Sequence, residues 1–97
     1  FQPHLYSRTR DFAKEFAQVL STLDEVILLD IYPAREEPIP GVSSQLIFDA
    51  ITCENKQMAT LQNLCNVLAE KDLEVLVTLG AGDIDKLVPQ LKEIYSR

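Results

Sequence analysis

The stretch VILLDI at residues 26–31 decides the fold of this 97-residue chain. A short and almost unbroken apolar run of this kind is typical of a strand that is covered on both faces, so we expect a central strand there. A second apolar run, EVLVTL at residues 74–79, is rich in β-branched side chains and predicts a further strand. Residues 56–59 leave room only for a short edge strand. The chain is therefore expected to fold around a sheet.

Apolar residues at helical spacing surround these runs. In residues 9–23, apolar side chains recur at intervals of three and four, which predicts an amphipathic helix. Ser43 or Ser44 can cap a second helix, and Thr60 can cap a third. The apolar positions of the three helices are Phe12, Phe16, Val19, Leu20 and Leu23 in the first, Leu46, Ile47, Ala50 and Ile51 in the second, and Leu61, Leu64, Cys65 and Leu68 in the third.

Two turn-forming segments follow the apolar runs. Residues 32–41 hold three of the five prolines and a glycine, so neither a helix nor a strand ladder can run through them. The glycine turn at residues 80–83 precedes the last helix. We expect that helix to begin near Asp85 or Lys86, because Pro89 then lies in its first turn. Its apolar residues are Leu87, Val88, Leu91 and Ile94.

Strands that alternate with helices predict an α/β domain. Short right-handed crossovers place such strands in one parallel sheet. We therefore expect a three-layer Rossmann-like domain with a mostly parallel sheet and helices on both faces. Residues 1–2 are too short to be the strand that His4 should follow. Earlier parts of the same domain are accordingly expected upstream of Phe1.

Composition excludes several classes of protein. The chain has 15 Asp and Glu against 9 Lys and Arg, which leaves no basic stripe for nucleic-acid phosphates. It has no apolar stretch of membrane-spanning length and no signal-peptide pattern at residue 1, so we expect a soluble, cytoplasmic protein. Cys53 and Cys65 lack metal-type spacing and are expected to be reduced packing residues.

Three polar clusters follow predicted strands, at residues 4–10, 32–37 and 80–83. The carboxyl ends of parallel strands share one edge of a sheet, where ligands of open α/β domains bind. Arg8 presents a planar guanidinium, and His4 can donate a hydrogen bond or carry charge near neutral pH. We expect these two residues to bind an anionic group of a substrate, and Arg10 to form a surface pair with Asp11 or Glu15.

The other two clusters offer weaker candidates. Tyr32 could pack on a ligand, while Glu36 could hold an amine or a metal-bound water, or lie solvated on the surface. Gly80 and Gly82 permit a close approach of backbone to a ligand, although a tight strand-to-helix turn explains them equally well. The chain has no G-x-x-x-x-G-K-[ST] loop. We assign no catalytic residue and no metal ligand within it.

Three blocks of sequence resemble one known family in the family's own order. They are FQPHLYSRTRDF at 1–12, LLDIYPAREEPIPGVSS at 28–44 and TLGAGDI at 78–84. Together they resemble the C-terminal domain of the Mur ligases of peptidoglycan synthesis. The first block is highly specific and the third is supportive. The chain departs from the family pattern at Leu5, which is usually arginine, and at Arg35, which is often glycine.

The resemblance implies an ATP-dependent ligase that forms an amide between L-alanine and UDP-N-acetylmuramate. It implies two upstream domains, one that binds the UDP-sugar and a central one that binds ATP and Mg²⁺ outside this segment. Residues 1–97 would then be a partial C-terminal domain, inactive alone, that helps to bind the amino acid. By the same resemblance, His4 and Arg8 match positions implicated in substrate contact.

Two other functions stay open from the sequence. The chain could be a free-standing Rossmann-like module that binds a nucleotide or an anion at the turn of residues 80–83. It could also be an interaction domain that docks through the proline-rich segment at residues 32–41. Calorimetry with such a ligand would discriminate the first of these from a ligase fragment.

Overall fold

The computed structural model describes residues 1–73, 75–80 and 82–95 of the chain. Glu74 and Ala81, which belong to the predicted second run and glycine turn, lie outside the described residues. The elements follow one another as α1 (Tyr6–Leu20), β1 (Glu25–Leu28), α2 (Gln45–Ala50), β2 (Asn55–Met58), α3 (Leu64–Ala69), the 3-10 helix η1 (Asp83–Leu87) and α4 (Val88–Tyr95). This order confirms an α/β chain.

β1 and β2 form a two-stranded parallel sheet. Glu25 pairs with Asn55 at one end of the ladder, and Leu28 pairs with Met58 at the other. The apolar run at residues 26–31 is therefore a strand over its first half, and the short strand expected at residues 56–59 is present one residue earlier. α2 connects the two strands, as expected for a parallel pair.

Residues 1–4 run along the opposite side of β1. The Phe1 amine donates a hydrogen bond to the Ile27 carbonyl at 2.8 Å, and the Leu29 N–H donates to the Phe1 carbonyl at 2.9 Å. A parallel bridge then joins His4 to Tyr32. The two residues judged too short for a strand are thus hydrogen-bonded beside the central strand.

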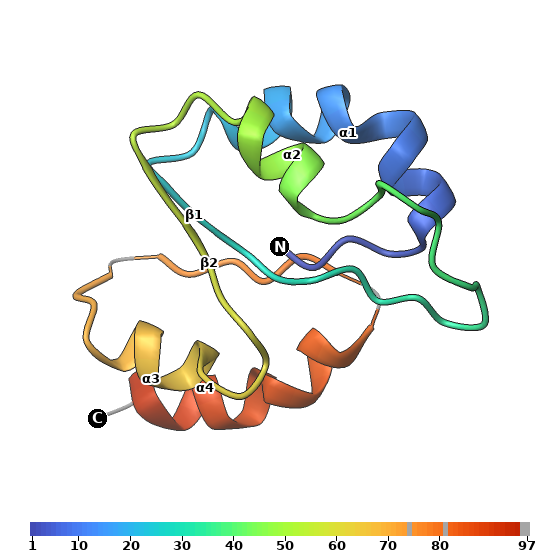
Figure 1. Cartoon of the computed structure of the whole chain (residues 1–97). Coiled ribbons are helices and arrows are strands. Elements are labelled where there is room, and N and C mark those ends of the chain that lie inside the picture. Colours follow the sequence, from blue (N-terminus) through green and yellow to red (C-terminus); the bar gives the residue numbers. More distant parts are fainter. Residues whose placement is uncertain (74, 81, 96–97) are drawn as a thin grey trace.

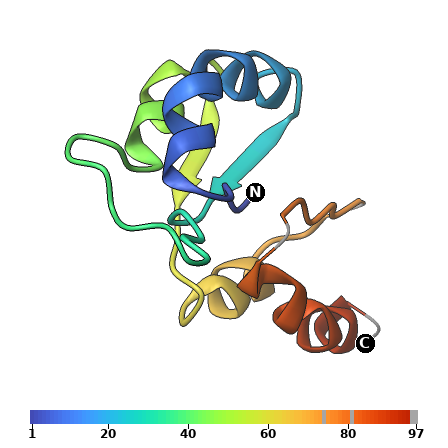
Figure 2. The same cartoon turned by 90° about the vertical axis from the view of Figure 1, so that its right-hand side faces the viewer.

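Helices lie on both sides of β1. Figure 1 shows α1 and α2 on one side and α3 and α4 on the other, and Figure 2 shows the same separation from a second direction. Leu28 belongs to the apolar cluster on the first side and Leu29 to the cluster on the second. Adjacent residues of a strand point to opposite faces, so β1 is covered on both faces as its apolar sequence predicts. The first cluster consists of Ala17, Leu20, Val26, Leu28, Ile47 and Ile51, and the second of Leu29, Ala59, Leu64, Leu68, Ile84 and Leu91.

The strand predicted at residues 74–79 is wrong for the described residues 75–79, which belong to no strand. A strand needs a ladder of repeated backbone hydrogen bonds. Among the described residues, the Gln2 N–H donates to the Leu79 carbonyl at 2.9 Å, and no ladder follows from that contact. Val75 and Val77 are 78% and 64% exposed. Residues 75–79 therefore have the apolar pattern of a strand, but among the described residues no neighbouring strand pairs with them.

The helices differ from prediction mainly at their ends. α1 begins at Tyr6 rather than residue 9 and ends at Leu20 rather than residue 23. In α2 the buried face includes Ile47, whereas Leu46 and Ala50 are exposed, so two of the four residues assigned to its apolar face were wrong. Pro89 lies in the first turn of α4, as predicted, and η1 leads into it.

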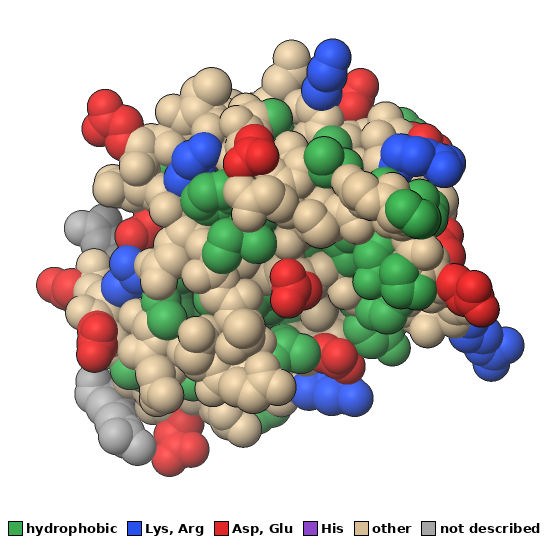
Figure 3. Space-filling view, viewed as in Figure 1, with side chains coloured by type: hydrophobic (Ala, Val, Ile, Leu, Met, Phe, Trp, Pro, Cys, Tyr) green, Lys and Arg blue, Asp and Glu red, His purple; other side chains and the backbone are tan. Residues whose placement is uncertain are grey.

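Three properties inferred from composition can be compared with the structure. Within the described ranges, none of the helices has the length and apolar character needed to cross a membrane. Figure 3 shows blue Lys and Arg side chains scattered singly over one face, so among the residues described there no basic stripe crosses that face. Cys53 and Cys65 are free and pack partly against the two apolar clusters.

Candidate functional site

The three polar clusters meet at one end of the sheet. The rings of His4 and Tyr32 stack with their centroids 5.8 Å apart and their planes 17° from parallel. Gly82 lies directly against the Tyr32 ring, because a Cβ built on Gly82 would fall 2.8 Å from the Tyr32 Cβ. Residues from all three clusters are therefore in contact, although residues 75–79 do not form the strand from which the place of the third cluster was predicted.

Gln2 links the first cluster to the third, a role that the sequence pattern did not predict. Its side chain is only 4% exposed, and its Oε1 accepts a hydrogen bond from the Ile84 N–H at 2.9 Å. Gly80 packs closely on Gln2, since an added Cβ would lie 3.1 Å from the Gln2 carbonyl oxygen. A glutamine directly before the Pro3-His4 pair is the only sequence signal for this role.

These contacts give both turn glycines a packing reason. Gly80 lacks a side chain where Gln2 passes, and Gly82 lacks one where the Tyr32 ring lies. Asp83 and Asp85 occupy the first turn of η1, and their charge disfavours an anion there. Gly80 and Gly82 therefore each have a packing role in the site.

Arg8 and Arg10 differ sharply in their surroundings. Arg10 Nε donates to Asp11 Oδ1 at 2.9 Å, which raises the pKa of Arg10 and lowers that of Asp11. Arg8 is exposed in the first turn of α1 and, among the described residues, makes no ion pair. The surface pair expected for Arg10 is confirmed, and the Arg8 guanidinium is left available for a ligand.

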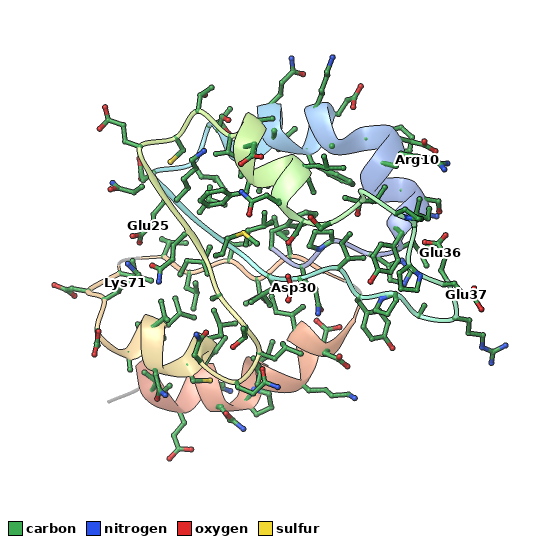
Figure 4. The ribbon with its side chains drawn as sticks, viewed as in Figure 1. Arg10, Glu25, Asp30, Glu36, Glu37 and Lys71 are labelled. Carbon is green, nitrogen blue, oxygen red and sulfur yellow. The ribbon has the colours of Figure 1, made fainter. Side chains whose placement is uncertain are left out.

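Glu36 is occupied by contacts within the protein. Its Oε1 accepts a hydrogen bond from the Ser7 N–H at 2.9 Å, and its Oε2 accepts one from the Ser7 hydroxyl at 2.6 Å. The Ser7 hydroxyl is the main cause, and the Ser7 N–H the next, of a lowered pKa for this carboxyl group. Figure 4 shows Glu36 beside the first turn of α1, on the same side of the molecule as Arg10.

A cavity of about 170 Å³ opens beside Tyr32. Asp30, from the end of the central strand, and Asp83, from η1, contribute carboxylates to its lining. Thr60 and Gln62, which follow β2, add a hydroxyl and an amide. Asp30 and Thr60 each lie two residues beyond the end of a strand, a position at the sheet edge that the sequence pattern could have indicated. An acidic lining of this kind suits a cationic amine.

Other features of the surface lie away from this site. A larger apolar hollow of about 420 Å³ is lined by residues from the 73–78 segment and α4, among them Leu76 and Leu91. Lys71 pairs with Glu25 at 2.8 Å, at the opposite end of the central strand in Figure 4. Among the residues described, no group of three His, Cys, Asp or Glu side chains could hold a metal ion.

Known proteins match the chain over its whole length. It is 63% identical over 92 residues to the UDP-N-acetylmuramate--L-alanine ligase of Phocaeicola vulgatus, covering 94% of this chain and 20% of that protein. It is 61% identical over 97 residues to the ligase of the same name from Parabacteroides distasonis, covering 100% of this chain and 21% of the relative. The chain is similar to one segment of each of these ligases. For the Flavobacterium johnsoniae ligase the identity is 49% over 96 residues, or 99% of this chain and 21% of the relative.

The chain spans about one fifth of the length of these curated ligases. The match to the Parabacteroides distasonis ligase includes every residue of the site described above, since it covers the chain completely. No family model matches the chain.

Proposed function

We propose that this chain is the C-terminal, amino-acid-binding domain of a UDP-N-acetylmuramate--L-alanine ligase of peptidoglycan synthesis. The observation that carries the proposal is the end-to-end match of the chain to these ligases. Arg8 is exposed in the first turn of α1, and His4 stacks on Tyr32. The intact enzyme would use ATP in the cytoplasm and would contain two upstream domains. Residues 1–97 alone are expected to be inactive.

The proposed reaction is the formation of an amide. ATP phosphorylates the lactyl carboxylate of UDP-N-acetylmuramate to an acyl phosphate, with release of ADP. The amine of L-alanine attacks the acyl carbon, phosphate leaves, and the amine proton passes to a base. ATP and Mg²⁺ are proposed to bind mainly to other parts of the ligase, and no step here is assigned to a metal.

The residues of this segment are proposed to bind and orient the amino acid. Arg8 and His4 suit a carboxylate, either that of L-alanine or that of the product, because a guanidinium can donate two parallel hydrogen bonds to it. Tyr32 stacks on His4 and lines the neighbouring cavity, so it fixes the imidazole and forms one wall. Holding the amine near the acyl carbon accelerates the attack, because the two reactants no longer have to meet by diffusion.

We also propose a specific fold for the domain to which this chain belongs. A three-layer Rossmann-like domain is supported by residues 1–4 running along β1 and by the Gln2 N–H, which donates to the Leu79 carbonyl. Helices on both sides of β1 support the same arrangement.

The test compares Arg8→Ala with Arg10→Ala in the intact ligase. Arg8→Ala is expected to lower kcat/KM for L-alanine by about 30-fold or more, since truncating one partner of a charge pair costs about 2–5 kcal/mol. Arg10→Ala, two residues away and paired with Asp11, is the matched control and should leave kcat/KM within about threefold. Equal effects of the two variants would reject the role of Arg8, and an intact protein without ligase activity would reject the proposed function.

A further inference from the structure

Two strained residues lie in the segments that form the candidate site. Leu5 has φ 69° and ψ 140°, and Ala34 has φ 54°. They are the only non-glycine residues with positive φ in the described ranges. Side chains disfavour this backbone region, so such a conformation persists only where surrounding contacts hold it. The contacts that hold the Leu5 turn therefore also decide where His4 and Arg8 are placed.

The segment of residues 32–36 supplies several of these contacts. The Tyr32 carbonyl accepts a hydrogen bond from the Leu5 N–H at 2.9 Å. The Leu5 carbonyl is in turn held by Thr9, which is 0% exposed and donates from its hydroxyl at 2.9 Å. Glu36 completes the set with its two hydrogen bonds from Ser7, the residue next to Arg8.

α1 has no other acidic group at its beginning. Its N-cap residue is Leu5, which cannot accept a hydrogen bond through its side chain, and its first turn contains no Asp or Glu. A carboxylate stabilises the start of a helix because it accepts from unpaired N–H groups and opposes the helix dipole. Glu36, which is 29 residues away in the sequence, provides this carboxylate.

We propose that Glu36 is a positioning residue that holds the first turn of α1 so that Arg8 faces the amino-acid carboxylate. The inference rests on the proposed function. Each carboxylate oxygen of Glu36 accepts a hydrogen bond from Ser7, so Glu36 acts on Arg8 through the first turn of the helix. The neighbouring Glu37 is exposed and, among the described residues, makes no hydrogen bond, so the two carboxylates have different roles.

The experiment measures KM for L-alanine, kcat and Tm in the intact ligase for Glu36→Gln and for Glu37→Gln as its matched control. An amide at residue 36 keeps the shape but loses the charge, which weakens both contacts with Ser7. Glu36→Gln is expected to raise KM for L-alanine about tenfold while kcat stays within about threefold. Glu37→Gln should change neither constant.

A double-mutant cycle with Arg8→Ala tests whether Glu36 acts through Arg8. In the Arg8→Ala background, Glu36→Gln should change KM for L-alanine by less than about twofold, because the group that it positions is already absent. Ser7→Ala removes the hydroxyl contact alone and should raise KM in the same direction, which keeps the test decisive if Glu36→Gln does not fold. A lower Tm or kcat with unchanged KM would overturn the inference, as would equal effects of Glu36→Gln with and without Arg8. An Arg8→Ala variant without effect would instead reject the proposed function of the site.

Discussion

At the scale of single residues, the site depends on the tight packing of the Tyr32 ring and on the absence of a side chain at Gly82. Gly82 leaves the space that the Tyr32 ring fills, and Tyr32 in turn stacks on His4. Gly41 is the contrasting case, because it has φ +78° and nothing within 4 Å of an added Cβ. One glycine is required by packing and the other by its backbone conformation.

We predict that Gly82→Ala destabilises the chain more than Gly41→Ala. The added methyl of Gly82→Ala must displace Tyr32, and forced displacement in a packed region costs about 1–3 kcal/mol. Gly41→Ala meets only the strain of a positive φ, about 1 kcal/mol. Urea unfolding of the two variants measures the difference. If Gly41→Ala proved the more damaging, the contact of Gly82 with Tyr32 would not matter for stability.

The contact between Glu36 and Ser7 predicts a pH dependence. Hydrogen bonds from Ser7 hold the pKa of Glu36 below its usual value of 4.5. The stabilisation is therefore complete above pH 4.5 and is lost as the pH falls through the lowered pKa. Urea unfolding between pH 6 and pH 3 should show the wild type losing its advantage over Glu36→Gln. A difference that stays constant over this range would contradict the prediction.

At the scale of elements, the short helices depend on tertiary packing. α2 has six residues, which is too short for a stable isolated helix. Its Ile47 is fully buried in the cluster shared with α1 and β1, whereas Leu46, the preceding residue, is 40% exposed. The buried face of α2 is therefore rotated from the predicted one, so that Ile47 and Ile51 lie in the core and Leu46 does not.

We predict a large difference between two truncations in α2. Ile47→Ala should lower the free energy of unfolding by about 2–5 kcal/mol, because it leaves a cavity in the core. Leu46→Ala removes a side chain of similar size from a largely exposed position and should cost less than about 1 kcal/mol. Chemical denaturation of both variants provides the comparison. Similar losses would mean that the helix is rotated from its described orientation.

At the scale of the whole molecule, two apolar clusters stabilise the domain from the two sides of β1. Ile84 is buried in the second cluster, whereas Val75 and Val77 are mostly exposed. An apolar side chain in this part of the chain is therefore not always a buried one. The stability of the 97-residue chain should depend on Ile84 and not on the exposed valines.

We predict that replacing Val75 and Val77 together by Thr changes the free energy of unfolding of the 97-residue chain by less than about 1 kcal/mol, because both side chains are mostly exposed. Ile84→Ala should cost about 2–5 kcal/mol. Thermal or urea unfolding measures both. A loss above about 2 kcal/mol in the double valine variant would show that these side chains are covered in solution.

Local patterns in the sequence were sufficient for the α/β class and for the parallel pairing around residues 26–31. These features follow from hydrophobic periodicity, which each segment carries within itself. The roles of Gln2 and Glu36 arise only in the tertiary structure. The hydrogen bond of Gln2 spans a sequence separation of 82 residues, and that of Glu36 spans a separation of 29. Residues 75–79 likewise form no strand in the described structure in spite of their apolar pattern, because strand formation depends on a neighbouring strand. Periodicity specifies which face of a segment is buried, whereas pairing across long separations is settled when the whole chain packs.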